Sequence, residues 1–111
     1  MIVLEEMLYG YSIRTEAHRL DQGVHVLITG GCRTHVGAVS AAMPGEPPET
    51  MAFPGHKDHL ISEPWAAALA RRLGERAVVA CGIHYHAATA EQIAEILRVT
   101  GRMLQEILDQ M

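Results

Sequence analysis

The chain has 111 residues, of which 49% are hydrophobic and 20% are charged, and its net charge is −4 with histidine neutral. This length suits one domain with its own core, so we expect a single domain over residues 1–111. The acidic balance and the lack of any basic run argue against nucleic acids and anionic membrane surfaces as partners, because both attract clustered Lys and Arg.

The cysteines and the N-terminal residues indicate the cellular compartment in which the protein is expected. Cys32 and Cys81 are the two cysteines, and they stand far apart in the sequence. Residues 1–7 lack the basic and apolar regions of a secretory signal, and no stretch reaches the roughly 18 apolar residues of a membrane span. We therefore expect a soluble, cytoplasmic protein whose thiols are reduced.

The first half of the chain predicts strands joined by turns. The prediction rests on alternating apolar and polar side chains, on glycine-containing turns and on one run of unusually small residues. In chain order we expect a half-buried strand at 8–17, a turn at 21–23, a returning strand at 24–29 that ends at Gly30 and Gly31, a third strand at 35–42, and a proline-rich loop at 44–55 with a short edge strand at 49–53.

The second half predicts a helix, a strand and a second helix. Ser62 is a candidate N-cap with Pro64 in the first turn after it, and Gly74 supplies a C-terminal stop. The apolar run at 77–83 indicates a strand covered on both faces. A Thr-x-x-Gln capping box at 89–92 begins the last helix, whose Leu and Ile stripe we assign to the core. This order predicts an α+β fold, a two-layer sandwich of a mainly antiparallel sheet with two helices on one face.

Polar side chains gather in three segments at strand ends or in loops, where binding residues concentrate. The segments are residues 30–35, 56–59 and 82–86, and each contains histidine, of which the chain has seven. We expect the three segments to converge on one edge of the sheet.

One of these segments suggests an anion site. Backbone N–H groups after Gly30 and Gly31 can form a concave nest for a phosphate, and the Arg33 guanidinium adds a charged fork. The alternative is that the glycines only end the strand. Lys57, the one lysine of the chain, is a candidate phosphate or carboxylate contact, and the alternative is a solvated side chain.

The histidines also admit a metal site. His84 and His86 lie two apart in an extended segment, so their rings are expected on one face, and His56 or His59 can supply a further ligand for zinc. The chain contains no CxxC or HExxH pattern. Solvated or hydrogen-bonded histidines are therefore the alternative.

A catalytic interpretation is open as well. His59 with Asp58 or Glu63 can form an acid–base pair, and Cys32 or Ser40 is a candidate nucleophile. Adjacency in sequence does not establish that geometry, and no nucleophile elbow is present.

Four short segments in a particular order carry a resemblance to a known family. They are Leu-Ile-Thr-Gly-Gly at 27–31, His-Val-Gly-Ala-Val at 35–39, His-Lys-Asp-His at 56–59 and Gly-Ile-His-Tyr at 82–85. Together they resemble the small D-type accessory subunit of gallate and related hydroxyarylic acid decarboxylases, a prenylated flavin chaperone-like domain. The similarity extends from about Val24 to the last helix.

The resemblance implies an accessory protein rather than an enzyme. Such a protein would bind prenylated flavin mononucleotide (FMN), or FMN, and assist maturation of the large subunit of a UbiD-type aromatic acid decarboxylase. The cofactor-binding residues implied in this way are Gly30, Gly31, Arg33, His35, His56, Lys57, His59 and His84.

Two further expectations accompany this interpretation. The alternative function is a small metal-dependent hydrolase, similar to adenosylcobinamide amidohydrolases, with zinc on His56, His59, His84 and His86.

A small sheet with exposed edges also favours a homodimer.

Overall fold

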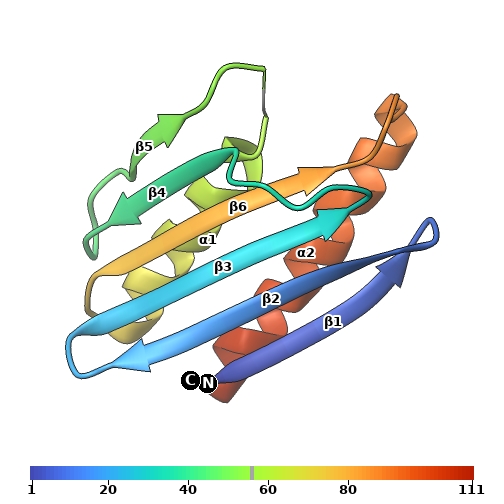
Figure 1. Ribbon diagram of the computed structural model, residues 1–111. Coiled ribbons are helices and arrows are strands. Elements are labelled where there is room, and N and C mark those ends of the chain that lie inside the picture. Colours follow the sequence, from blue (N-terminus) through green and yellow to red (C-terminus); the bar gives the residue numbers. More distant parts are fainter. Residues whose placement is uncertain (56) are drawn as a thin grey trace.

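The computed structural model describes residues 1–55 and 57–111, and it confirms the α+β sandwich. One sheet forms the first layer, and two helices lie against one of its faces as the second layer (Figure 1). The elements in chain order are β1 (Ile2–Leu8), β2 (Tyr11–Leu20), β3 (Gly23–Gly31), β4 (Ala38–Ala42), β5 (Glu49–Ala52), α1 (His59–Leu73), β6 (Ala77–His84) and α2 (Ala90–Gln110).

The topology brings two strand ends together. The strand order is β1-β2-β3-β6-β4-β5, and every neighbouring pair is antiparallel except β3 and β6, which are parallel. The chain passes through β4, β5 and α1 between these two strands, so the carboxyl ends of β3 and β6 lie side by side. In sheets with parallel strands, ligands commonly bind outside such carboxyl ends.

The core fills the space between the sheet and the helices. Alternate side chains of the central strands point into it, and Ile13, Val26 and Val79 are fully buried there. Leu69 of α1 and Ile107 of α2 are buried against them. Burial of each such side chain stabilises the fold by about 1.5–3 kcal/mol, so this layer supplies the main stabilisation.

Several local predictions are confirmed at the ends of elements. The Thr89 hydroxyl accepts from the Gln92 N–H at 3.1 Å, and the Gln92 side chain accepts from the Thr89 N–H at 2.9 Å, which completes the capping box. Gly74 ends α1 in the left-handed conformation with a φ of 64°. The turn before Gly23 and the edge strand β5 are also present.

The N-terminal hairpin differs from the prediction. The strand expected at 8–17 is β2, which begins only at Tyr11, and Leu8 ends an additional strand, β1. Tyr9 and Gly10 form the turn between them with φ angles of 52° and 80°. β1 was missed because adjacent glutamates interrupt its apolar pattern, and charged side chains of this kind suit an exposed edge strand.

The start of α1 also differs from the prediction. Asp58, not Ser62, occupies the N-cap position, and Pro64 lies inside the helix. Ser62 is buried, and its hydroxyl is 2.7 Å from that of Ser40 on β4, which is in turn 2.7 Å from the hydroxyl of Thr50 on β5. The Ser62 side chain therefore joins the helix to the sheet by a satisfied buried hydrogen bond.

The prediction that β6 is covered on both faces is wrong. Its side chains alternate between buried and accessible positions, and Val78 is 38% exposed on the face without helices. On that face, strand register aligns Met51, Val39, Ala80 and Leu27 in a row across β5, β4, β6 and β3. The apolar run of β6 thus contributes side chains both to the core and to the apolar row on the open face. The homodimer remains a prediction.

Candidate functional site

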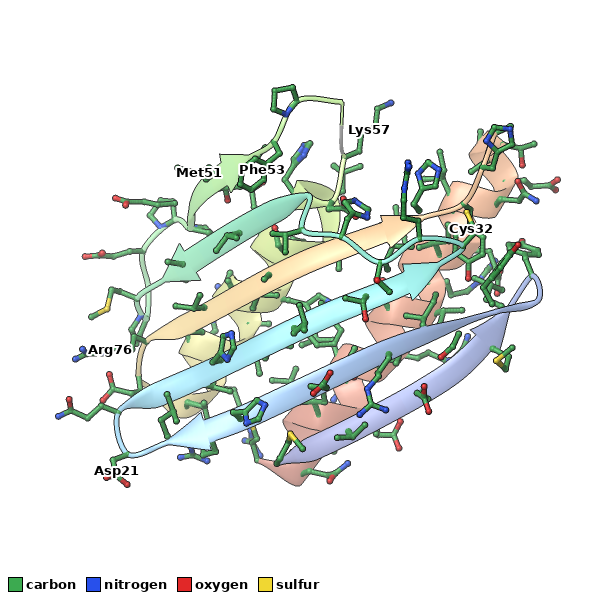
Figure 2. All side chains as sticks on the ribbon, viewed as in Figure 1. Asp21, Cys32, Met51, Phe53, Lys57 and Arg76 are labelled. Carbon is green, nitrogen blue, oxygen red and sulfur yellow. The ribbon has the colours of Figure 1, made fainter. Side chains whose placement is uncertain are left out.

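The predicted segments at 30–35 and 82–86 meet at the carboxyl ends of β3 and β6. Gly31 pairs with His84 in the sheet, and the Cys32 N–H donates to the His84 carbonyl at 2.8 Å. The rings of His35 and His84 meet edge to face with centroids 6.4 Å apart. Figure 2 shows Cys32 at this end of the sheet and the Asp21 hairpin at the other.

Glycines allow the loop after β3 to lie directly on β6. A Cβ atom on Gly82 would lie 1.7 Å from the His35 carbonyl oxygen, and one on Gly31 would lie 1.9 Å from the His84 carbonyl oxygen. Gly31 also has a φ of 82°, which side chains disfavour. The close approach of two backbones therefore requires glycine at both positions.

A buried carboxylate joins the start of α1 to the same place. Asp58 is 6% exposed; its Oδ1 accepts from the Ile83 N–H at 2.9 Å, and its Oδ2 lies 3.2 Å from His35 Nε2. A Cβ atom on Gly37 would lie 1.9 Å from this Oδ2, so glycine there makes room for the carboxylate. Although Asp58 is the N-cap residue, its side chain makes no capping hydrogen bond. It holds the loop, the helix and β6 in one arrangement.

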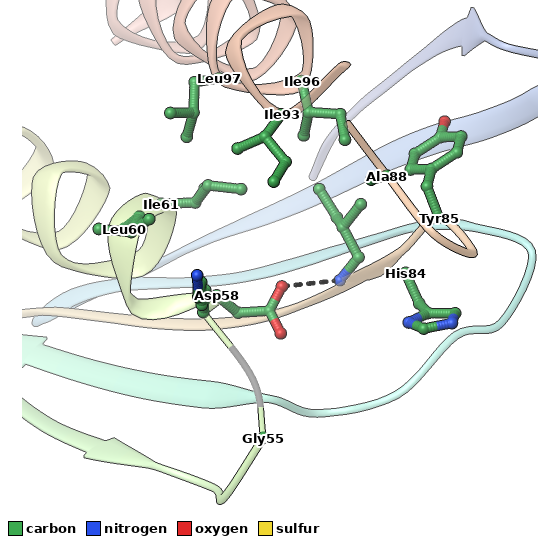
Figure 3. Close-up of a pocket in the computed structure, with 12 residues that line it drawn as sticks. Gly55, Asp58, Leu60, Ile61, His84, Tyr85, Ala88, Ile93, Ile96 and Leu97 are labelled. Carbon is green, nitrogen blue, oxygen red and sulfur yellow. Dashed lines mark hydrogen bonds between the residues drawn. The ribbon is translucent and has the colours of Figure 1, made fainter. Parts of the chain in front are cut away.

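An apolar cavity of about 180 Å³ opens between the N-terminal ends of the helices and the end of β6 (Figure 3). Ile93 and Leu97 of α2 are 37% and 39% exposed here, so part of the stripe assigned to the core lines a cavity instead. The aliphatic lining consists of Leu60, Ile61, Ile83, Ala88, Ile93, Ile96 and Leu97, and the polar groups are those of Lys57, Asp58, His84 and Tyr85.

A second, shallower depression adjoins the apolar cavity. Cys32, Arg33, His84 and His86 line this basic hollow, whose volume is about 390 Å³. Arg33 and His86 are exposed, so their nitrogen donors are accessible to a ligand. His84 lines both the basic hollow and the apolar cavity, and the two therefore meet at its ring.

The wall beside His84 is fixed by a tyrosine cluster. The Tyr85 hydroxyl donates to the Leu8 carbonyl at 2.8 Å, and the rings of Tyr9 and Tyr11 each contact the Tyr85 ring at a centroid distance of 6.0 Å. Burial raises the pKa of Tyr85 above its ordinary value, with smaller effects from Cys32 and Tyr9. The phenol therefore stays a donor, which anchors the end of β6 to the first hairpin.

The structure separates the predicted cofactor-binding residues into groups. Arg33, His35, Lys57 and His84 gather around the two depressions. His59 lines a different hollow, with Pro47, Pro48, Leu60, Glu63, Pro64 and Ala67.

Three further predicted residues complete this comparison. Gly30 faces the core, where a Cβ atom would lie 3.0 Å from the Ile13 side chain. Packing thus accounts for Gly30 and Gly31, and their contact with a phosphate stays a prediction. His56 lies outside the described residues.

The acid–base prediction is wrong in its pairing. Asp58 contacts His35 rather than His59, and Glu63 accepts a hydrogen bond from the Thr50 hydroxyl at 2.8 Å. Ser40 is fully buried in its hydroxyl network, out of reach of a substrate, and so cannot act as the predicted nucleophile.

The described residues offer no group of ligands for the predicted zinc ion. Across residues 1–55 and 57–111, no three His, Cys, Asp or Glu side chains form a group that could hold a metal ion. The three described members of the predicted zinc set, His59, His84 and His86, are therefore not brought together as ligands. Likewise, neither helix in the described part of the chain is long and apolar enough to cross a membrane.

The two thiols are expected to react very differently. Cys32 is exposed, whereas Cys81 is buried, and burial followed by the nearby Asp58 charge raises the pKa of Cys81 well above its usual range. Because the thiolate is the reactive form, we expect a disulfide reagent to modify one thiol per native chain and two per unfolded chain. Cys32→Ser should abolish the native reaction; rapid modification of Cys81 in that variant would contradict this assignment.

Comparison with known proteins agrees with the resemblance noted in the sequence. Residues 8–111 match the family described as the prenylated flavin chaperone LpdD-like domain. Protein LpdD of Lactiplantibacillus plantarum is 30% identical over 104 residues, which cover 89% of this chain and 76% of the relative. The chain therefore belongs to the prenylated flavin chaperone LpdD-like family, and this membership supports a chaperone or accessory role connected with prenylated flavin.

Proposed function

We propose that this protein binds prenylated FMN or FMN and assists maturation of the large subunit of a UbiD-type aromatic acid decarboxylase. Its family supports the connection with prenylated flavin. The observation that carries the flavin site is the meeting of the apolar cavity and the basic hollow at His84.

A flavin nucleotide has two chemically different ends, an aromatic ring system and a phosphate. Arg33 and His86 give the basic hollow guanidinium and imidazole N–H donors, which are groups that bind phosphate. The aliphatic side chains of the apolar cavity suit the ring end, since small-molecule sites are mostly apolar with a few polar groups. A ligand lying across His84 therefore has each end in matching surroundings.

The other residues of this site have supporting roles. His35 lies beside His84 and is held by Asp58, and Lys57 stands on the lining of the apolar cavity as a further cation. Gly31 and Gly82 give the site its shape by letting the loop lie on β6. His59 lines a different hollow and is not part of the proposed site.

Flavin titration tests the proposal directly. We expect Arg33→Gln to weaken binding of FMN and prenylated FMN alike by about 10-fold to 100-fold, because a charge-assisted hydrogen bond to phosphate is lost. Flavin fluorescence and absorbance measure the affinities. Arg19→Gln is the matched control, since Arg19 is exposed on β2 beside the hairpin at the far end of the sheet; it should bind like the wild type.

Two results would overturn the proposal. If the wild type binds neither flavin, the site is not a flavin site. If flavin binds and yet the loaded protein transfers none to a flavin-free decarboxylase subunit, as judged by flavin content after the two proteins are separated, the maturation role is wrong.

A further inference from the structure

We propose that two copies of this chain pack face to face through the side of the sheet that carries no helices, the open face. This interaction is separate from the proposed flavin site. Figure 1 shows the open face toward the viewer, with α1 and α2 behind the sheet. A second copy is the partner that fits, because the side chains on this face are complementary to one another about a two-fold axis.

Two rows of side chains cross the middle of the open face, from β5 through β4 and β6 to β3. The first is the apolar row already described, which consists of Met51, Val39, Ala80 and Leu27. The second row lies two residues away along each strand and consists of Glu49, Ala41, Val78 and His25. Large apolar side chains remain accessible in both rows, since Met51 is 66% and Val78 is 38% exposed.

Size is complementary at the centre of the two rows. A two-fold axis that runs parallel to the strands, between β6 and β4, sets β6 of each copy against β4 of the other. Ala80 then faces Val39 in the apolar row. Val78 faces Ala41 in the second row, so a larger side chain meets a smaller one each time. An axis along the apolar row, perpendicular to the strands, would instead set Ala80 against Ala80 and Val39 against Val39, which packs less well.

The ends of the rows are complementary as well. The same axis sets β3 of each copy against β5 of the other, so His25 faces Glu49 twice across the interface. Both side chains are exposed, and an imidazole N–H can donate to a carboxylate. Leu27 and Met51 meet in the same way at the ends of the apolar row. The contact therefore has an apolar centre and polar ends, as protein interfaces commonly do.

The strands outside this contact carry charge on the open face. Because the axis lies between β6 and β4, the hairpin of β1 and β2 in each copy extends past β5 of the other. On this hairpin the Arg14 guanidinium lies 3.8 Å from the Glu5 carboxylate and 3.4 Å from that of Glu16. Burying such charges is costly, and here they stay in water. The charged part of the open face is thus the part that the second copy leaves uncovered.

The edges of the sheet suit a second copy less well than the open face. The edge strand β1 has adjacent glutamates, Glu5 and Glu6, and the other edge strand, β5, has four residues. Charged side chains and short length both discourage pairing of one edge with another. The two copies are therefore expected to stack their sheets rather than extend them.

The loop after β3 and the dimensions of the strands set the size of the contact. The loop crosses the open face above Gly82, where an added Cβ atom would meet the His35 carbonyl oxygen. Each loop lies over its own β6 and opposite β4 of the other copy, so the two loops lie side by side. Two stacked layers of these strands cover about 1,000 Å² in total, which is in the lower range of specific interfaces. We therefore expect a dissociation constant in about the micromolar range.

Two valines with the same exposure provide a matched test. Val78 lies at the centre of the contact, and Val3 lies on the open face of β1, outside the contact; each is 38% exposed. Val78→Asp should raise the dissociation constant by about 100-fold or more, because two unpaired carboxylates would be buried at the centre. Val3→Asp should dimerise like the wild type. Sedimentation equilibrium at several protein concentrations measures the constants, and circular dichroism checks folding.

A charge exchange tests the orientation of the two copies. Glu49→Lys and His25→Glu should each weaken the dimer by about tenfold, because each removes the hydrogen bond between these side chains at two symmetric places. The double variant, Glu49→Lys with His25→Glu, should recover the wild-type dissociation constant to within about threefold, since a glutamate then faces a lysine. Both positions are exposed, so this test also serves if Val78→Asp does not fold.

Three outcomes would contradict the inference. A wild type that stays monomeric at about 100 μM lacks such an interface. Equal effects of Val78→Asp and Val3→Asp would place the contact elsewhere. Failure of the double variant to recover the dimer that each single change weakens would show that β3 does not face β5. None of these outcomes concerns flavin, so the flavin titration tests the proposed function separately.

Discussion

Gly82→Ala is expected to lower the free energy of unfolding by about 3 kcal/mol or more, which corresponds to a fall in Tm of about 15 °C for a domain of this size. The added Cβ atom would lie 1.7 Å from the His35 carbonyl oxygen. Both atoms in this overlap are close to the main chain, so no side-chain rotation relieves it. The loop after β3 must move away from β6, which breaks the contacts that build the site. Thermal and urea denaturation measure the loss.

A second glycine provides the matched control for this prediction. Gly101 lies on an exposed part of α2, and a Cβ atom there would meet nothing within 4 Å. Gly101→Ala should therefore stabilise the protein by up to about 1 kcal/mol through its higher helix propensity. Equal stability of Gly82→Ala and the wild type would show that the loop does not lie on β6 as described.

Asp58→Ala is expected to cost about 2–3 kcal/mol of stability. The substitution removes the acceptor for the Ile83 N–H and the partner of His35 Nε2, and it leaves a partly buried donor without a hydrogen bond. Removal of the Asp58 carboxylate should also loosen the start of α1, because this carboxylate links the N-cap position of the helix to β6. Urea denaturation of the purified variant measures the change.

The comparison with Asp58→Asn separates geometry from charge. An asparagine amide oxygen can still accept from the Ile83 N–H, and its volume is nearly the same. We expect a loss below about 1 kcal/mol for this variant. If Asp58→Ala proved as mild as Asp58→Asn, the buried hydrogen bonds would not be what holds the three segments together.

Local signals predicted the parts of the fold that depend on neighbouring residues. The Thr89 capping box, the Gly74 stop and the turn before Gly23 each involve residues within four positions of one another. The start of α1 failed because Ser62 has the chemistry of an N-cap but bonds to Ser40, 22 positions away. A pattern that reports only on nearby residues cannot distinguish these two uses of a hydroxyl.

The candidate site was predictable only in part for the same reason. Histidine beside glycine drew attention to the two segments that meet at His84. The pairing of Asp58 with His35 spans 23 positions and depends on the crossover between β3 and β6. Ile93 and Leu97 follow the same helical spacing as core residues. They line a cavity because they lie beside the end of β6, and the spacing alone does not show where that strand ends. Glycine was the available signal for both close approaches, of the Asp58 carboxylate to the main chain at Gly37 and of two main chains at Gly82.

The contact between the loop after β3 and strand β6 affects the entropy cost of ligand binding at the proposed site. Main-chain hydrogen bonds from Cys32 and Gly37 to β6 hold this loop, at 2.8 and 2.9 Å, independently of any ligand. The loop is therefore already ordered before a ligand binds, so the protein loses little conformational entropy on binding. Binding at the proposed flavin site would therefore require no folding step in this loop.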